Sequence, residues 1–414
     1  LAQFAIQAAI LHAFVEAEGL RYVDASCEDA YVHCGVNLYR RSLVLVDIPG
    51  GAYTADIFRV KGGTIHDYLF HGMPSDVILD GPALSAPRKG TLAGENVEFG
   101  VKPEGVLPYH VDNSGYQYLY DVRECGMDTP YTARWKDKDG VTFAALFVPE
   151  GKETFMLTKG YPRPSSKTLP PMDFLVRRKE PSNSGALSTF ASVLSVEKTK
   201  PVVLGAERIP LASSSDPEAY AIRVRHTRGE DIIVSTLSPS GKASAADGGF
   251  TLNGQLGVAS WRDGRLARLT VIGGTEFTVN GKSVKLAAPE ARATIKQVYD
   301  DRLVLDRQLP AWAAGRVLFA DRKPVQSSYW VKAVKGASVS VGPGTWIGRG
   351  RLDRWDASKG TIFDSRDIFP LGEKRNRLAD ITGMKYPEGN RNYYAGSWLV
   401  SENGAARYRL TSGG

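Results

Sequence analysis

Residues 52–72, AYTADIFRVKGGTIHDYLFHG, decide the fold of this chain. The run 53–60 is rich in β-branched and aromatic residues, which favour strands. The Lys61-Gly62-Gly63 step that follows is typical of a hairpin turn or a bulge. We therefore predict a second strand over 64–71 that runs back antiparallel to the first.

This second strand carries two of the six histidines of the chain. Side chains alternate along a strand, so His66 shares one face with Tyr68, whereas His71 lies on the other. We expect His66 and Tyr68 to face a cleft and His71 to support the interior of the sheet. Arg59, at the end of the first strand, is expected at the same rim.

The composition around this stretch favours an all-β protein. The 414 residues include 43 glycines, 23 prolines and 18 tyrosines but only five methionines, which suits many short strands joined by turns. The fold class that we predict is a large antiparallel β-sandwich, supersandwich-like, followed by smaller β units and preceded by a short N-terminal helix. Three cysteines cannot supply a disulfide framework.

Charge and motifs narrow the partners. The formal charge of +7 suits an anionic ligand. No zinc-finger spacing, recognition-helix pattern or RNP-like aromatic block is present, so nucleic acid is not the expected partner. No apolar run reaches the roughly 18 residues of a membrane-spanning helix. Metalloprotease, EF-hand and nucleophile-elbow motifs are also missing from the sequence.

Changes in pattern along the chain predict its domains. Apolar residues at helical spacing open the sequence and predict the last helix of an upstream α-helical domain. Closely spaced strands follow, among them a hairpin around Glu18-Gly19 and a strand at 131–136, with softer boundaries after residue 200 and near residue 290. The predicted domains are a residual helix (1–12), a β-sandwich domain (13–200), a second β-sandwich part (201–290) and a C-terminal β domain (291–414).

Several blocks carry a family resemblance. They are YRRSLVLVD at 39–47, DIFRV at 56–60, GGTIHDY at 62–68 with His71-Gly72 after it, and PMDFLVRRK at 171–179 followed by TFASVL at 189–194. This pattern resembles the β-domain of the heparinase II/III family of polysaccharide lyases. The resemblance covers roughly residues 20 to 200.

The resemblance implies a lyase that acts on uronic-acid polysaccharides. Such an enzyme removes the C5 proton beside a carboxylate and expels the 4-linked oxygen, which requires neutralisation of the carboxylate, a base and an acid. In the family the site lies between an N-terminal α/α toroid and the β-domain, and His66 matches the β-domain histidine. The candidate catalytic residues are His66, Tyr68 and Tyr109, and the candidate substrate-binding residues are Arg59, Arg41 and His71.

Metal binding is left open by the sequence. Several family members hold a structural zinc ion through two histidines and an aspartate, and one of these histidines follows the catalytic one by two positions. Tyr68 occupies that position here, so no cofactor is predicted. His71, Asp80 and His110 are ligand types that would suit a substitute zinc or calcium site.

Two main functions therefore compete. The first is a periplasmic or secreted polysaccharide lyase, or its β-domain portion, that cleaves an acidic polysaccharide or oligosaccharide with a toroid domain supplied upstream or by another chain. The alternative is a non-catalytic carbohydrate-binding or structural β-module of a larger glycan-degrading protein. A hydrolase on the same scaffold would need a pair of acidic residues in a cleft, and no such pair is evident.

Overall fold

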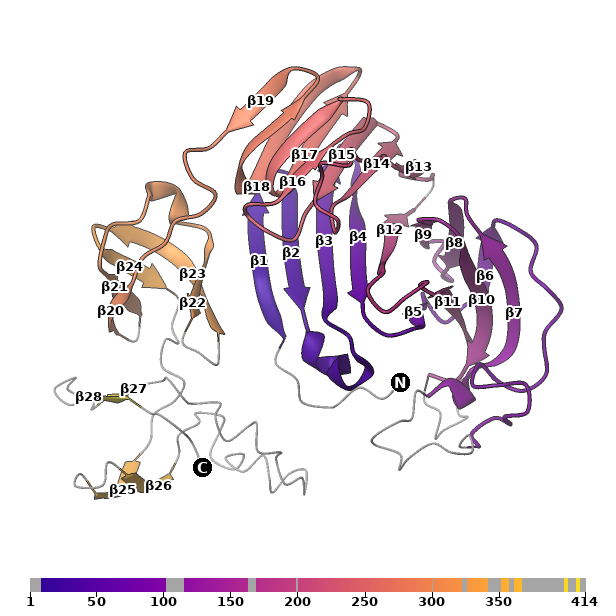
Figure 1. The fold of residues 1–414 in the computed structure, drawn as a ribbon, viewed down its shortest axis with the longest axis horizontal. Coiled ribbons are helices and arrows are strands. Elements are labelled where there is room, and N and C mark those ends of the chain that lie inside the picture. Colours follow the sequence, from indigo (N-terminus) through magenta and orange to yellow (C-terminus); the bar gives the residue numbers. More distant parts are fainter. Residues whose placement is uncertain are drawn as a thin grey trace. The chain divides into compact units, whose positions relative to one another are not determined.

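The computed structural model divides into two compact units, Leu1–Glu290 and Ala291–Gly414 (Figure 1). Strands make up nearly all of the regular structure, which confirms the predicted all-β class. The structure describes residues 9–101, 115–162, 169–198, 200–299, 301–321, 326–341, 351–356, 361–366, 398–400 and 407–409.

The described part of the first unit contains three antiparallel sheets, and the largest is the central sheet. In spatial order its strands are β1 (Ile10–Ala17), β2 (Leu20–Ser26), β3 (Leu38–Ile48), β4 (Gly51–Lys61), β12 (Leu187–Glu197), β9 (Thr142–Val148), β8 (Tyr131–Lys136) and β6 (Val77–Asp80). A 3-10 segment, η1 (Glu28–Cys34), lies between β2 and β3 in the chain, and η2 (Tyr116–Tyr118) precedes β7.

The other two sheets are called the small sheet and the outer sheet. The small sheet consists of β5 (His66–Phe70), β11 (Met172–Lys179), β10 (Glu153–Gly160) and β7 (Tyr120–Met127). The outer sheet consists of β13 (Val203–Arg208), β14 (Tyr220–His226), β15 (Gly229–Ser235), β17 (Phe250–Arg262), β18 (Arg265–Val279) and β19 (Lys282–Lys285), with β16 (Lys242–Ser244) paired to β17.

Strand β4 is covered on both faces. Tyr53, Ala55 and Ile57 belong to a core shared with the outer sheet. Phe58 and Val60 belong to a second core shared with the small sheet. Because successive side chains point to opposite faces, the outer and small sheets pack on opposite faces of the central sheet at this strand. The continuous burial of Ala55 to Val60, six successive residues of β4, is the pattern expected of a strand covered on both sides.

The first core crosses the predicted boundary at residue 200. It joins Val44 and Ile57 of the central sheet to Val224 and Val258 of the outer sheet. Residues 201–290 thus supply a layer that packs on residues 13–200, and both lie in the first unit. Each layer buries the apolar face that the other leaves uncovered.

The predicted hairpin between 53–60 and 64–71 is wrong. β4 pairs with β3 and β12, whereas β5 pairs with β11 in the small sheet. Gly62 and Gly63 both have positive φ angles, 98° and 83°, and carry the chain from one sheet to the other. Phe58 and Tyr68 then meet across the core with ring centroids 6.1 Å apart. Facing sheets bury both apolar strands, which a flat hairpin cannot do.

Other strands lie close to their predicted positions. The hairpin expected around Glu18-Gly19 is formed by β1 and β2, which pair up to Ala17 and Leu20. The strand predicted at 131–136 is β8. Residues 1–8 of the predicted N-terminal helix lie outside the described residues, and Ile10–Ala17 forms a strand rather than a helix.

The switch between sheets makes Gly62 sensitive to substitution. A Cβ atom added there would overlap the carbonyl oxygen of Gly35, and the positive φ disfavours any L side chain. We expect Gly62→Ala to lower the free energy of unfolding by about 2 kcal/mol. Gly264→Ala is the matched control, because Gly264 has φ +75° with no atom within 4 Å. Equal losses for the two variants in urea denaturation would contradict this account.

The described part of the second unit has one five-stranded antiparallel sheet and two small hairpins. The sheet order is β20 (Ile295–Val298), β21 (Arg302–Leu305), β24 (Ser338–Val341), β23 (Gln326–Lys335) and β22 (Val317–Asp321), with η3 (Ala311–Ala313) before β22. The hairpins pair β25 (Arg351–Asp356) with β26 (Thr361–Arg366) and β27 (Trp398–Val400) with β28 (Arg407–Arg409). Among the described residues of both units, no helix has the length and apolarity that crossing a membrane requires.

Candidate functional site

Three of the sequence blocks meet in one hydrogen-bonded cluster. Arg41 comes from β3, Asp56 from β4 and Tyr68 from β5. Arg41 donates from Nε and Nη2 to the two oxygens of Asp56 at 2.9 and 2.7 Å. The Tyr68 hydroxyl donates to Asp56 Oδ2 at 2.8 Å and lies 3.3 Å from Arg41 Nη2. The Arg41–Asp56–Tyr68 cluster thus links the central sheet to the edge strand of the small sheet.

The cluster is buried at one end and open at the other. The side chain of Asp56 is inaccessible to solvent, whereas that of Arg41 is 47% exposed. Burial lowers the pKa of Arg41, but the hydrogen bonds and charge of Asp56 outweigh this effect and raise the pKa. Arg41 Nη1 has no hydrogen bond to any described residue, so this half-exposed cation is able to bind an anion.

Tyr68 acts as a donor within the cluster. Burial, and then the charge of Asp56, raise the pKa of Tyr68, so its hydroxyl keeps its proton at neutral pH. Its ring packs against Phe58 and Phe190 in the second core. Tyr68 therefore orients Asp56, and through it Arg41.

His66 is packed beside Gly62 and Gly63, where the chain passes from the central sheet to the small sheet. It is 5% exposed, and its Nε2 lies 2.6 Å from the carbonyl oxygen of Gly62, to which it donates a proton. Burial lowers the pKa of His66, which favours the neutral ring. Its Nδ1 is buried and has no hydrogen-bond partner among the described residues. An unprotonated Nδ1 with a free lone pair is the form that a general base requires.

Arg59 does not lie at a rim. It is fully buried between the central and outer sheets, where Nε donates to the carbonyl of Glu218 at 2.7 Å and Nη2 to that of Ser235 at 3.1 Å. Burial lowers the pKa of Arg59 to about 10. Its donors are used to join the two sheets rather than to meet a ligand.

His66 and Tyr68 were expected to face a cleft and His71 to support the interior of the sheet, but the structure shows the opposite arrangement. His66 and Tyr68 point into the protein. His71 lies past the end of the strand and is exposed, with its ring 5.2 Å from that of Phe174. The alternation was predicted correctly, but the sheet that covers one face could not be. Tyr109 lies outside the described residues.

The residues of the described chain do not fit the zinc site of the resembled family. No group of three or more histidine, cysteine, aspartate or glutamate side chains is gathered in the described residues. Asp80 is 81% exposed and lies 3.9 Å from Arg134, and His110 is outside the described residues. At the position of the family's second histidine, the Tyr68 hydroxyl binds Asp56, whose charge Arg41 already neutralises.

Sequence reasoning assigned no role to Asp56. It lies inside a quoted block, between the apolar residues Ala55 and Ile57. A carboxylate in a strand buried on both faces needs a cationic or hydrogen-bonding partner. That requirement was the available signal for a charged cluster at this position.

Comparisons with known proteins add distant similarities. No protein-family model and no curated protein sequence matches this chain. A heparan sulfate lyase from Pedobacter heparinus is 9% identical over 56% of this chain and 28% of its own, with a TM-score of 0.35, and a mutant of that lyase gives 0.36. A heparinase III is 11% identical over 55% of this chain and 28% of its own, with a TM-score of 0.34. The chain thus spans less than a third of each of these proteins.

Proposed function

We propose that this chain is the β portion of a secreted or periplasmic lyase that cleaves a uronic-acid polysaccharide by β-elimination. The observation that carries the proposal is the Arg41–Asp56–Tyr68 cluster, in which one residue from each of three family-like blocks meets the others. The half-exposed guanidinium of Arg41 offers charge for a substrate carboxylate, and His66 lies two residues from Tyr68 on the same strand face.

The chemistry follows from these groups. In β-elimination a base takes the C5 proton, a C4–C5 double bond forms, the C4–O bond breaks and the departing oxygen takes a proton. A guanidinium on the carboxylate stabilises the charge that develops when the proton leaves. His66 is the candidate proton acceptor in this chain, a role that requires its buried Nδ1 to become accessible to the substrate, and Tyr68 is a positioning residue. The remaining acid and base groups would come from an α/α toroid upstream or in another chain.

Substitution of Arg41 tests this proposal. We expect Arg41→Gln to lower kcat/KM by about tenfold, mainly through KM, because one charge-assisted contact to the substrate is lost. The assay follows the ultraviolet absorbance of unsaturated uronate from alginate and glycosaminoglycans, with and without a polypeptide that carries the toroid. Arg21→Gln is the control, since Arg21 is another exposed arginine paired with an aspartate, Asp47.

The decisive outcomes are distinct. Loss of product on Arg41→Gln and His66→Gln, but not on Arg21→Gln, supports the lyase. Absence of unsaturated product from every acidic glycan, with the toroid present, overturns it.

A second candidate is a non-catalytic module that binds acidic glycans. It is favoured by the burial of His66 and Tyr68, which leaves Arg41 as the exposed member of the group. In that case we expect salt-sensitive retention on immobilised heparin or alginate that Arg41→Gln weakens, without any unsaturated product.

A further inference from the structure

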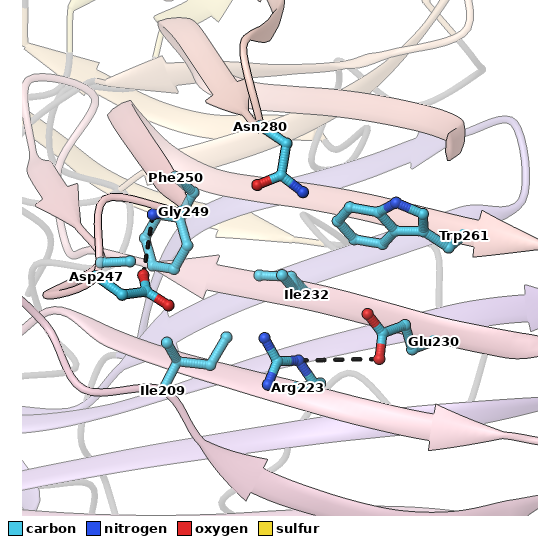
Figure 2. A pocket seen from close by; sticks show the side chains of 10 residues that line it. Ile209, Arg223, Glu230, Ile232, Asp247, Gly249, Phe250, Trp261 and Asn280 are labelled. Atoms are coloured by element: carbon cyan, nitrogen blue, oxygen red, sulfur yellow. Dashed lines mark hydrogen bonds and ion pairs between the residues drawn. The ribbon is translucent and has the colours of Figure 1, made fainter. Parts of the chain in front are cut away.

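A small pocket lies on the outer sheet. Its lining residues, which lie within 209–280, come much later in the chain than the Arg41–Asp56–Tyr68 cluster. Its volume is about 140 Å³. The side chains that define it are Arg223, Glu230, Ile232, Asp247, Trp261 and Asn280 (Figure 2). They come from β14, β15, β17, the turn before β17 and the turn after β18.

The pocket opens on the face of the outer sheet that points away from the central sheet. Ile222 and Ile233 lie in the core shared with the central sheet. Their neighbours Arg223 and Ile232 pair directly across β14 and β15 and therefore share the opposite face. Glu230 pairs with Trp261 in the same way across β15 and β17. The strand register thus brings a cation, an acid, an aliphatic residue and an indole onto one surface.

The pocket has an apolar floor and an aromatic wall. Ile232, Phe250 and Ile209 line it and are buried within a separate hydrophobic core of the outer sheet. Trp261 is half-buried against this core. In Figure 2 the indole stands on the side opposite Asp247, and Asn280 lies between them. The Asn280 N–H donates to the carbonyl of Gly249 at 3.1 Å, which fixes the turn at this edge.

The polar groups around this floor retain free hydrogen-bonding capacity. Asp247 accepts the Gly249 N–H with Oδ1 at 2.9 Å, and its Oδ2 has no partner among the described residues. Within the described part of the chain, the Glu230 carboxylate has one ion-pair partner, Arg223 Nε at 3.9 Å. Arg223 Nε is buried beside Glu230, and Nη1 donates to Glu207 at 2.9 Å, whereas Nη2 has no hydrogen bond to any described residue. Two carboxylates thus offer acceptors, and the Nη2 group offers donors.

The local charge is opposite in sign to that of the whole chain. Glu207, Glu230 and Asp247 carry three negative charges, which outnumber the two positive charges of Arg223 and of Arg225, the direct partner of Glu230 across β14 and β15, although the chain as a whole has a formal charge of +7. Like charges at short range repel. An anionic group is therefore disfavoured here, in contrast to the exposed Arg41.

We propose that this pocket binds one uncharged pyranose ring of a glycan. The face of a sugar ring carries C–H groups of slightly positive charge, which suit the negative face of an indole. Its hydroxyls donate to Glu230 and Asp247 and accept from Arg223. The volume is below the roughly 300–1,000 Å³ of sites for drug-sized ligands, which limits the occupant to a single ring. This inference goes beyond the proposed lyase activity and does not depend on it.

Saturation-transfer NMR on the full chain tests the proposal, with methyl β-glucopyranoside, N-acetylglucosamine, glucosamine and glucuronate as separate probes. We expect signals from the two uncharged sugars and weaker signals from glucuronate. Trp261→Ala is expected to reduce the signals about three- to tenfold through loss of the aromatic contact. Trp312→Ala is the matched control, because Trp312 is 57% exposed and belongs to the second unit.

Glu230→Gln is a second variant, which tests the pocket even if Trp261→Ala fails to fold. Glu230 is a half-exposed side chain, so its amide is expected to leave the melting temperature unchanged while it weakens the neutral-sugar signals. Three results would overturn the proposal: no transfer to uncharged sugars, transfer in Trp261→Ala and Glu230→Gln as strong as in the wild type, or binding of glucosamine or glucuronate alone. Arg41 does not line this pocket, so the NMR experiment tests the pocket independently of the lyase assay.

Discussion

Glu153→Leu is expected to destabilise the first unit by about 3–5 kcal/mol, because it leaves Arg177 as an uncompensated buried charge. The Arg177 side chain is 1% exposed and that of Glu153 is inaccessible. Arg177 donates from Nε and Nη2 to the two Glu153 oxygens at 2.7 and 3.0 Å. It also donates to the carbonyls of Ala191 at 2.9 Å and Val148 at 3.4 Å, which belong to the central sheet. The pair therefore joins the small sheet to the central sheet.

A double substitution separates the pair from the charge. Glu153→Leu with Arg177→Met removes both charges and keeps apolar volume, so we expect it to recover most of the loss. Urea denaturation of the single and double variants measures this difference. Lys285→Ala is the surface control, since Lys285 is 71% exposed beside Glu276, and it is expected to change the free energy of unfolding by less than about 1 kcal/mol. A double variant as unstable as the single one would contradict the charge argument.

The second large effect concerns Asp231, which joins the central and outer sheets. Its Oδ2 accepts the Tyr53 hydroxyl at 2.6 Å, and its Oδ1 accepts Arg262 Nη1 at 2.9 Å. His226 Nδ1 accepts the Arg228 N–H, so its Nε2 carries the proton and faces Asp231 Oδ2 at 3.2 Å. We expect Asp231→Asn to cost about 3–5 kcal/mol at pH 6, because Arg262 loses its buried counter-charge.

The pKa of Asp231 predicts the direction in which its contribution to stability changes with pH. Burial raises the pKa of Asp231, but the hydrogen bonds from His226, Arg262, Tyr53 and Ser260 outweigh it and lower the pKa to about 2. A depressed pKa stabilises the fold above the unfolded value near 4, and this stabilisation, about 2 kcal/mol, is lost as the pH falls through 2. The stability difference between wild type and Asp231→Asn is therefore expected to narrow between pH 4 and pH 2.

Denaturation at a series of pH values measures this narrowing. Asp47→Asn is the control, because Asp47 is 43% exposed. A gap for Asp231→Asn that stays constant down to pH 2, or a narrowing of equal size for Asp47→Asn, would show that Asp231 is not the group responsible.

Local pattern predicted much of this architecture, whereas long-range pairing was not predictable. The alternation in 64–71 gave the correct shared face of His66 and Tyr68, and the strand predicted at 131–136 has the bounds of β8. The sheet that β5 joins depends on β11, more than 100 residues later in the chain. Glycine at positions 62 and 63 fits a hairpin and a sheet switch equally well, because both need positive φ.

The candidate sites show the same limit. Arg41, Asp56 and Tyr68 are close in the sequence, and the resemblance already drew attention to their blocks. The neutral-sugar pocket draws on residues from 209 to 280. Its members become neighbours only through the pairing of β14 with β15 and of β15 with β17. No short motif records that register, so the pocket could be found only in the folded chain.

The double coverage of β4 has a consequence for how the protein can be dissected. A fragment that ended near residue 200 would keep the small sheet but lose the outer one. The fragment would then expose a broad hydrophobic surface to water, formed by Tyr53, Ala55, Ile57 and the apolar residues beside them. Surfaces of that kind drive self-association. Expression fragments for crystallography or binding work should therefore end after residue 290, where the first compact unit ends.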